Sequence, residues 1–364
     1  MCLDFGDDDY GERVEEVVRL VQSAGVARHR VIGGRRQRPD PKFYAGRGKV
    51  EEIARAAAEL NAGYVVFNHE MSPAQQRNVE KELSVRTLDR TELILEIFAQ
   101  RAQTNEGKLQ VELARLQHLS TRLVRGWTHL ERQRGGFGAT GGPGETQLEL
   151  DRRYIATKVK TLKGRLEQLQ KQRSVQRRAR SRGDVLSLSI VGYTNAGKST
   201  LFNALANARA YEADQLFATL DTTTRRIWIP PANPVVLSDT VGFIRDLPHT
   251  LVAAFRATLE ETVHADVLLH VVDASSPVRD MQQEEVNKVL AEIGADAIPQ
   301  ILVMNKIDAA RFEPAVERDQ YGTISRVFVS ARTGSGLDDL RRAIAEFGAA
   351  RSAQRNPSKA SISL

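Results

Sequence analysis

The chain has 364 residues, a net charge of +6 and 41% hydrophobic residues. This length is sufficient for two or three domains, each with its own hydrophobic core. Its one cysteine, Cys2, excludes a disulfide-stabilised scaffold, and no apolar run reaches the roughly 18 residues that a membrane-spanning helix needs. The acidic start of the chain is unlike a signal peptide. We therefore expect a cytoplasmic protein without stable membrane insertion.

The charge is unevenly distributed along the chain. Residues 1–184 contain 34 Lys and Arg against 25 Asp and Glu, whereas residues 185–364 contain 18 against 21. Within residues 152–182 there are 12 basic residues and a single acidic one, Glu167. A basic segment of this kind predicts a polyanionic partner.

The first 90 residues alternate between helical and strand-like patterns. The predicted helix–strand pairs are 14–21 with 27–32, 50–60 with 64–68, and 73–83 with 85–88. Helices that alternate with strands in this way predict a small parallel α/β subdomain over 1–90. Residues 44–49 (Tyr-Ala-Gly-Arg-Gly-Lys) form half of a phosphate-binding motif, and we interpret them as a turn into the second helix.

Residues 91–183 have the longer period of amphipathic helices. The apolar positions are Leu109, Leu113, Leu116, Leu123, Trp127 and Leu130, followed after a gap by Ile155, Val159, Leu162, Leu166 and Leu169. Two such helices close together in sequence are predicted to pair as a long antiparallel hairpin. Taken alone, this pattern is also typical of a spacer or a dimer surface.

A glycine-rich segment, 135–144, joins the two predicted helices. Six of its ten residues are glycine, and a passive helical turn needs only two to five residues. Close backbone approach and a stacking face at Phe137 suit an RNA ligand. The predicted RNA-binding residues are Gly135, Gly136, Phe137, Gly138, Gly141, Gly142 and Gly144 at this tip, and Arg177, Arg178, Arg180 and Arg182 beyond the second seam.

Residues 192–199, Gly-Tyr-Thr-Asn-Ala-Gly-Lys-Ser, match the phosphate-binding pattern G-x-x-x-x-G-K-[ST]. A strand-like run precedes them and a helical pattern follows, which is the context that this loop requires. Backbone N–H groups would surround the phosphates, Lys198 would reach the β- and γ-phosphates, and the Ser199 hydroxyl would bind Mg²⁺. The predicted nucleotide contacts here are Gly192, Tyr193, Thr194, Asn195, Ala196, Gly197, Lys198, Ser199 and Thr200.

Three further motifs follow at strand ends, in the order typical of a guanine-nucleotide switch. Asp239 would hold Mg²⁺ through water, and the Gly242 N–H would meet the γ-phosphate. In the segment Asn305, Lys306, Ile307, Asp308, the Asp308 carboxylate can accept both guanine N–H donors, which adenine lacks. Beside Ser330, the backbone of Ala331 can address guanine O6. Four motifs in register predict that the chain binds GTP and GDP with Mg²⁺.

Two positions bear on hydrolysis. A switch threonine that senses the γ-phosphate should lie before Asp239, and the candidates are Thr219, Thr222, Thr223 and Thr224, although such residues also occur in plain β-prone linkers. Phe243 follows the Gly242 motif, where Ras-like switches have a glutamine that orients the attacking water. Because phenylalanine cannot hydrogen-bond water, we expect slow intrinsic hydrolysis.

Several segments closely resemble the HflX family of GTPases over roughly residues 14–345. They are GKLQVELARLQ (107–117), WTHLERQ (127–133), GGFGATGGPGETQLELDRR (135–153), GYTNAGKSTLFNAL (192–205), FATLDTT (217–223) and DTVGFI (239–244). The resemblance implies an α/β chain in which a P-loop GTPase domain follows a small parallel α/β domain and the helical hairpin. We expect boundaries at 1–90, 91–183 and 184–348, with a disordered tail over 349–364.

The resemblance also assigns roles in the site. Residues 217–220 are similar to the switch segment of the Obg and HflX families, which selects Thr219 as a magnesium ligand beside Ser199 and Asp239. Asn195 resembles asparagines that hold K⁺ against the phosphates in GTPases without the glutamine; the alternative is that it only braces the loop. The implied catalytic residues are Lys198, Thr219, Gly242 and Asn195.

The implied function is that of a monomeric GTP hydrolase, stimulated by ribosomes, that binds the large ribosomal subunit and splits or rescues stalled ribosomes under stress. The hairpin tip would contact rRNA in the peptidyl-transferase region. Two alternatives stay open: an RNA remodeller that also binds ATP through its N-terminal domain, and a GTP-switched recruitment protein that does not split ribosomes.

The sequence departs from the family pattern at both ends. The family usually has a further N-terminal β-strand, which residues 1–12 are not expected to supply. Many members also carry a domain after the GTPase, where this sequence has only a Ser-, Arg- and Asn-rich segment over 351–364.

Overall fold

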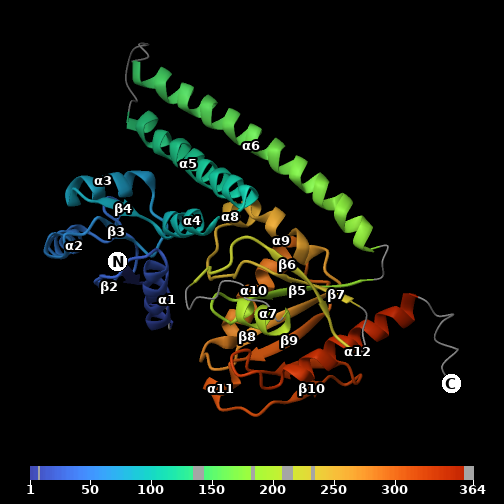
Figure 1. Cartoon of the computed structure of the whole chain (residues 1–364). Helices are drawn as coiled ribbons and strands as arrows, with labels where there is room; N and C mark the ends of the chain where they lie inside the picture. Colours follow the sequence, from blue (N-terminus) through green and yellow to red (C-terminus); the bar gives the residue numbers. More distant parts are fainter. Residues whose placement is uncertain (7–8, 134–142, 182–184, 207–215, 231–233, 356–364) are drawn as a thin grey trace, which may run out of the picture. The chain divides into compact units, whose positions relative to one another are not determined.

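The computed structural model describes residues 1–6, 9–133, 143–181, 185–206, 216–230 and 234–355 (Figure 1). The contacts divide the chain into two compact units, Met1–Glu167 and Gln168–Leu364. The expected N-terminal subdomain and most of the expected hairpin thus belong to one unit, and the boundary falls inside the second hairpin helix. The four-part division expected from the sequence stays a prediction.

The N-terminal subdomain alternates short strands with helices. Its elements are β1 (Cys2–Asp4), α1 (Tyr10–Ser23), β2 (Gly33–Arg35), α2 (Arg47–Leu60), β3 (Tyr64–Val66), α3 (Pro73–Leu83), β4 (Arg86–Leu88) and α4 (Arg90–Arg101). Strands β1 and β2 form one parallel pair, and β3 and β4 form another. The alternation and the parallel strands agree with the predicted subdomain. Its core gathers Leu3, Phe43, Val50, Ile53, Phe67, Val79 and Leu83.

Two details of this subdomain differ from the expectation. Residues 27–32, which were predicted to form a strand, are irregular, and the strand β2 begins only at Gly33. Strand β1 lies within the first 12 residues, where no strand was expected. The reason for the first difference is pairing, because a strand needs a neighbour and β1 reaches only as far back as Cys2.

Local capping explains where two helices begin. The Ser72 side chain accepts a hydrogen bond from the Gln75 N–H, and the Gln75 side chain accepts one from the Ser72 N–H. Asp89 and Glu92 form the same pair of bonds at the start of α4. These reciprocal bonds satisfy backbone N–H groups that have no partner inside a helix. They fix where α3 begins after a loop and where α4 begins after β4.

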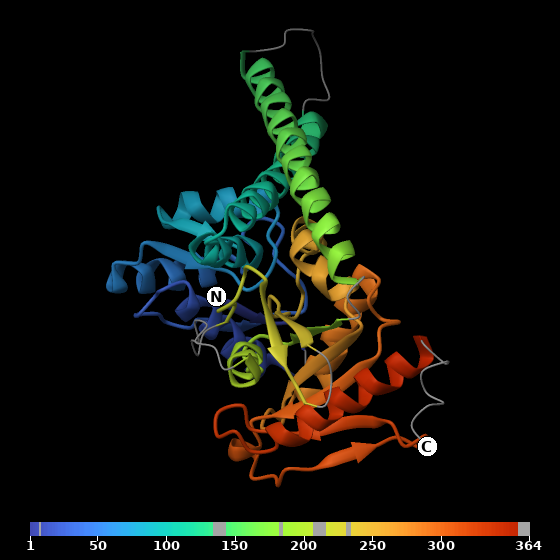
Figure 2. The same cartoon turned by 45° about the vertical axis from the view of Figure 1, so that its right-hand side comes forward.

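The helical hairpin consists of α5 (Asn105–Gln133) and α6 (Pro143–Ser181), which lie next to each other in Figure 1 and cross in the turned view of Figure 2. Buried Leu113, Leu162 and Leu166 form a seam with Leu109, Leu116 and Val159, as the heptads predicted. The side chains of Leu123, Trp127 and Leu130 lie outside the described part of the chain. Pro143 and Gly144, predicted as part of the tip, instead begin α6. Helix α6 continues to Ser181, past the last predicted apolar position, Leu169.

The second unit contains a seven-stranded mixed sheet. Its elements are β5 (Leu186–Gly192), α7 (Lys198–Ala206), β6 (Thr223–Trp228), β7 (Pro234–Asp239), α8 (His249–Ala254), α9 (Arg256–Val263), β8 (Val267–Asp273), α10 (Arg279–Ile293), β9 (Gln300–Asn305), α11 (Ile307–Ala310), β10 (Val316–Arg318), β11 (Ile324–Phe328) and α12 (Leu337–Arg355). The strand order is β10-β11-β9-β8-β5-β7-β6, with β6 and β10 antiparallel to their neighbours. This is the α/β GTPase domain that was predicted.

The core of this unit lies between the sheet and the helices α7 and α12. Leu188, Ile190, Val271 and Val303 from the central strands pack with Leu201 and Phe202 of α7 and with Leu340 and Ile344 of α12. Because parallel strands are buried on both faces, their sequences are nearly continuous apolar runs, as in β8. Helix α12 extends to Arg355, into the segment expected to be a tail, and residues 356–364 lie outside the described residues.

Candidate nucleotide site

The phosphate-binding loop joins β5 to α7, as its sequence context predicted. Gly192 (φ 149°) and Gly197 (φ 93°) have left-handed backbone conformations that favour glycine. A Cβ atom at Gly192 would overlap the Val271 carbonyl, and one at Gly197 would overlap the Asn305 amide. The loop therefore needs both glycines for conformation and for close approach to neighbouring strands.

Three oxygen-bearing side chains from three segments meet beside this loop. The Ser199 hydroxyl lies 2.7 Å from the Thr219 hydroxyl and donates to Asp239 Oδ2 at 2.7 Å. Thr219 also donates to Asp239 Oδ2, at 2.9 Å. The structure thus brings together the three residues predicted as magnesium ligands. Thr223 and Thr224 belong to strand β6 instead.

The donor set of this cluster fits a hard cation. Among the described residues, Asp239 Oδ1 is buried without a hydrogen-bond partner. Burial raises the pKa of the Asp239 carboxyl, while hydrogen bonds from Ser199 and the charge of Lys198 act in the opposite direction. Hydroxyl and carboxylate oxygens are the ligands that Mg²⁺ prefers, and a cation would satisfy the buried oxygen. We infer that Ser199, Thr219 and Asp239 hold Mg²⁺ when GTP is bound.

Lys198 is held inside the loop. Its side chain is buried, and its Nζ donates to the Tyr193 carbonyl at 2.7 Å. Burial lowers the pKa of Lys198 to about 8, although the Asp239 carboxylate opposes the shift. A Cβ atom at Gly242 would lie 2.8 Å from Lys198 Nζ, so the second switch motif passes directly over the lysine. A phosphate oxygen could therefore meet Lys198 and the Gly242 backbone together.

A small cavity of about 50 Å³ connects these groups. Its lining comes from the phosphate-binding loop, the switch segment and the second switch motif: Thr194, Asn195, Gly197, Lys198, Ser199, Thr200, Phe217, Ala218, Thr219, Thr240 and Gly242. Phe217, Ala218 and Thr240 were not singled out as contacts from the sequence. They adjoin motif residues, and that adjacency is the one signal that could have revealed them.

The predicted guanine-binding residues form a hydrogen-bonded frame. Asn305 donates through Nδ2 to the Ala196 carbonyl at 2.9 Å, and its Oδ1 accepts from the Ala331 N–H at 3.0 Å. The Ser330 hydroxyl donates to Asp308 Oδ1 at 2.7 Å. Asn305 therefore ties the phosphate-binding loop to the Ala331 segment, while the exposed Asp308 is oriented by Ser330.

Lys306 is positioned by a residue that the sequence reading missed. Its Nζ lies 2.8 Å from Asp273 Oδ2, and its backbone is left-handed with φ 63°. Asp273 ends the apolar strand β8, and a carboxylate at a strand end beside the motif strand was the available signal. This ion pair connects the Lys306 side chain, in the predicted guanine-binding segment, to the end of β8.

Phe243 belongs to the core and is fully buried. Its backbone N–H donates to the Gly192 carbonyl, and its carbonyl accepts from the Thr194 N–H at 2.7 Å. The residue thus joins the second switch motif to the phosphate-binding loop through its backbone. Its side chain supplies no polar group for water, as the sequence indicated.

Other predicted residues remain untested by this geometry. Asn195 lies on the cavity wall with φ 61°, and its role toward K⁺ stays a prediction. The tip residues Gly135 to Gly142 and Arg182 lie outside the described residues. Arg177, Arg178 and Arg180 fall on α6, but their side chains are not described.

Three family models match the chain in sequence order. They are described as GTP-binding GTPase N-terminal over 11–99, GTP-binding GTPase Middle Region over 101–180, and 50S ribosome-binding GTPase over 187–306. The GTPase HflX of Escherichia coli strain K12 is 55% identical over 343 residues, which are 94% of this chain and 80% of the relative. The chain belongs to the HflX GTPase family. Members of this family bind and hydrolyse GTP, and so does this protein.

Other comparisons agree with this assignment to the HflX family. GTPase HflX of Magnetococcus marinus is 49% identical over 91% of this chain and 77% of its own length. A solved structure titled as the crystal structure of an SsGBP and GDP complex matches 96% of this chain and 98% of its own with a TM-score of 0.50. At 24% identity, that match shows the fold alone. Within the described residues, none of the helices of this HflX-family chain is both long and apolar enough to cross a bilayer.

Proposed function

We propose that this HflX-family GTPase binds the large ribosomal subunit and separates stalled ribosomes into subunits while GTP is bound. The observation that carries the proposal is the joining, in one chain, of a GTP-responsive site with a long basic helical hairpin that ends in a glycine-rich tip. The family model over 187–306 is described as a 50S ribosome-binding GTPase, which supports the choice of partner.

The switch half of the proposal rests on Thr219. Its hydroxyl bonds to Ser199 and Asp239, which come from two other segments. A γ-phosphate with its Mg²⁺ would strengthen this convergence and hold residues 216–220 in place, whereas GDP would leave the threonine without that anchor. The switch segment can therefore report which nucleotide is bound.

The ribosome-binding half rests on the hairpin. Helix α5 packs against α3 and α4 of the N-terminal subdomain, and ion pairs made by two arginines strengthen the contact. Arg122 reaches Glu92 at 2.5 Å and Asp89 at 3.2 Å, and Arg115 reaches Glu96 at 2.7 Å. A hairpin anchored in this way at its base can place a distant tip against rRNA, and the excess of basic residues over 152–182 would be drawn to phosphates.

Hydrolysis should be slow without the ribosome. Phe243 offers no hydrogen bond to water, and the polar groups that line the cavity beside the phosphate-binding loop include Lys198, Thr219 and the Gly242 backbone. Asn195 would add a K⁺ ion to this set. We propose that the large subunit completes the site and raises the rate.

The decisive experiment is a sucrose-gradient assay with purified 70S monosomes. The parent chain loaded with a non-hydrolysable GTP analogue should convert monosomes to subunits, and the GDP-loaded chain should not. Shortening 135–144 to a four-residue turn should abolish the conversion while GTP binding persists, because the described seam around Leu113 and Leu162 is retained. A matched control replaces 320–322, an exposed turn in the GTPase unit, with a different turn of equal length.

The outcomes separate the competing functions. Splitting by the shortened chain at the parent rate would show that the tip is only a hinge. Binding to the large subunit without splitting would favour a GTP-switched recruitment protein. Unwinding of a naked RNA duplex with ATP would favour an RNA remodeller.

A further inference from the structure

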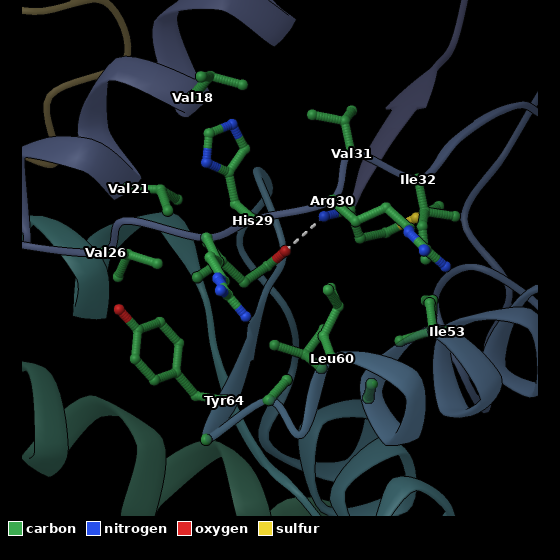
Figure 3. A pocket seen from close by; sticks show the side chains of 18 of the residues that line it. Val18, Val21, Val26, His29, Arg30, Val31, Ile32, Ile53, Leu60 and Tyr64 are labelled. Atoms are coloured by element: carbon green, nitrogen blue, oxygen red, sulfur yellow. Dashed lines mark hydrogen bonds between the residues drawn. The ribbon is translucent and has the colours of Figure 1, made fainter.

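Large hydrophobic side chains that are exposed occur in both units of the molecule. In the N-terminal subdomain, Val31 and Leu60 are exposed, but both line an apolar cavity together with aliphatic side chains of α1 and α2 (Figure 3). In the GTPase unit, Trp228 at the end of strand β6 is 68% exposed. An indole is among the largest apolar surfaces that a protein can remove from water, and tryptophan is highly buried on average. The surroundings of Trp228 therefore decide which partner could use it.

Strand β6 forms one edge of the seven-stranded sheet and pairs with β7 on its inner side (Figure 1). Successive side chains of a strand point to opposite faces of the sheet. Ile227 is buried in the core of the GTPase unit, so Arg226 and Trp228 belong to the opposite, open face of β6. Two residues apart on one strand, they start roughly 7 Å from each other, which is the scale of a single nucleotide. A guanidinium and an aromatic ring are thus neighbours on an open sheet edge.

The charge of this edge is positive and uncompensated. Arg225 and Arg226 are both exposed, and within the described part of the chain neither side chain has an ion-pair or hydrogen-bond partner. The one acidic residue of β6 and β7 is Asp239, which is buried at the nucleotide site. Charged residues on an edge strand can serve to prevent its pairing with other chains, but an exposed tryptophan has the opposite effect. The combination therefore favours a ligand that has both a phosphate and a flat ring.

Strand β6 is also the direct continuation of the switch segment. The Thr219 hydroxyl donates to Asp239, and β6 begins four residues later, at Thr223. Thr223 is the register partner of the same Asp239, and the Thr224 hydroxyl lies 3.1 Å from the Ser238 hydroxyl on β7. A nucleotide that fixes Thr219 through Mg²⁺ would therefore also fix the start of the strand that carries the two arginines and the tryptophan.

We propose that Arg226 and Trp228 form an RNA contact on the edge of the GTPase unit, which binds unpaired RNA of the large ribosomal subunit more tightly in the GTP-bound state than in the GDP-bound state. A base would stack on Trp228 while its phosphate pairs with Arg226, and Arg225 would add charge from the other face. Stacking on aromatic side chains beside basic groups is the usual way in which proteins hold unpaired nucleotides. The inference rests on the proposed function for the source of the RNA.

The occupant is unpaired RNA because of what an indole can reach. In double-stranded RNA the bases stack on one another and side chains cannot read the narrow major groove, whereas loops and bulges leave base faces open. The dependence on GTP follows from the strand itself, since RNA that needs an ordered β6 binds best when Thr219 is held in place. By thermodynamic linkage, RNA must then strengthen the binding of GTP by the same factor.

The experiment uses the full chain, a short RNA of four adenylates and the fluorescence of Trp228. The chain has two tryptophans, so Trp127→Phe leaves Trp228 as the only one. With a non-hydrolysable GTP analogue saturating the nucleotide site, the RNA should quench the fluorescence saturably, because a stacked base would contact the indole. With GDP in the site, the affinity for the RNA should be lower by roughly fivefold or more. A saturating amount of the RNA should raise the affinity for the GTP analogue equally.

Variants locate the contact, with binding followed by the anisotropy of a labelled RNA. Trp228→Ala should weaken binding roughly 5- to 100-fold, whereas Trp228→Phe should retain most of the affinity because it keeps an aromatic face. Arg226→Gln should reduce the slope of log affinity against log salt by roughly 0.7, the value for one phosphate contact on a single strand. The matched controls lie at the opposite edge of the same sheet: Arg318→Gln on β10 and Tyr321→Ala, 82% exposed, should bind as the parent does.

Three results would overturn the proposal: no quenching of Trp228 by the RNA, equal affinity of Trp228→Ala and Tyr321→Ala, or equal affinity in the two nucleotide states. Quenching by a ribosomal protein but not by RNA would also overturn it and would assign the edge to a protein partner. Monosome splitting separates this contact from the proposed function. A chain that splits monosomes without quenching keeps the function and loses the contact, and a chain that is quenched without splitting keeps the contact and loses the function.

Discussion

The seven-stranded sheet and the N-terminal subdomain have parallel strands in common but differ in how completely those strands are paired. Strand β5 is bonded to β7 from Leu186 to Ile190 and to β8 from Leu188 to Gly192. Strands β1 to β4 have three residues each and pair only two by two. The same alternation of helix and strand therefore gives one continuous sheet in the GTPase unit and two separate strand pairs in the N-terminal subdomain.

This difference shows what a precise site requires. In the GTPase unit, Asn305 at the end of β9 reaches Ala196 in the loop after β5, because the fully paired sheet fixes both strand ends. In the N-terminal subdomain, residues 27–31 were predicted to belong to a strand, but no strand pairing aligns them and they are irregular. Complete strand pairing fixes the positions of side chains that chemistry needs, whereas incomplete pairing leaves the neighbouring segments irregular. Each prediction below tests one side of this contrast.

The largest effect is expected from Phe243→Ala. Phe243 is fully buried where the second switch motif meets the phosphate-binding loop, so the substitution should leave a cavity and lower the free energy of unfolding by about 3–5 kcal/mol. Urea unfolding followed by circular dichroism measures the loss. Phe312→Ala is the matched control, because Phe312 is 45% exposed and should cost below about 1 kcal/mol. Equal losses in the two variants would contradict the role of Phe243 in the core.

Hydrogen exchange should distinguish the two units directly. Amides in β5 and β8 lie in a paired, buried sheet and should exchange roughly 100- to 1000-fold more slowly than those in β1 and β2, which open locally. Exchange measured by mass spectrometry of peptic peptides gives the ratio. Similar amide protection in both units would mean that the short strand pairs open as rarely as the seven-stranded sheet does.

The guanine frame predicts a change of base preference. Asp308→Asn should weaken GDP binding by roughly 10- to 100-fold, because an amide cannot accept both guanine donors and one hydrogen bond to a charged group is lost. Binding of xanthosine diphosphate should improve. Fluorescent nucleotide titrations measure both, with Asp280→Asn, an exposed position on α10, as the control. Full GDP affinity in the Asp308 variant would show that this carboxylate does not read the base.

The smallest predicted effect concerns pH. Lys198 has a pKa lowered by burial to about 8, and a bound phosphate would raise it again. Since binding then requires the protonated amine, affinity should be flat below pH 7 and fall roughly fourfold between pH 7 and 8.5. Lys198→Arg does not titrate in this range and is the control. The same decline in that variant would place the titrating group elsewhere.

The local sequence pattern predicted the structure correctly wherever the residues that determine it lie within the segment itself. The pattern over 192–199 predicted a strand, a loop and a helix, and β5 and α7 occupy those places. The run 73–83 matched α3 because Ser72 and Gln75 form a cap within the segment itself. The heptad pairing of Leu113 with Leu162 and Leu166 was likewise predictable, since period and spacing alone determine the seam.

Contacts between residues that are far apart along the chain could not be predicted from the local pattern. The sequence could not show that Asp273 pairs with Lys306, that Asn305 bridges Ala196 and Ala331, or that Phe243 joins Gly192 through its backbone. It also predicted a strand over 27–32, where the structure is irregular. The amino-acid sequence by itself determined the family, the four nucleotide motifs and the helical hairpin, because their signals lie in residues close together along the chain. Only the tertiary structure decided which strands are completed and which donors and acceptors meet, because a backbone edge or a carboxylate acquires its partner from whatever the fold places beside it.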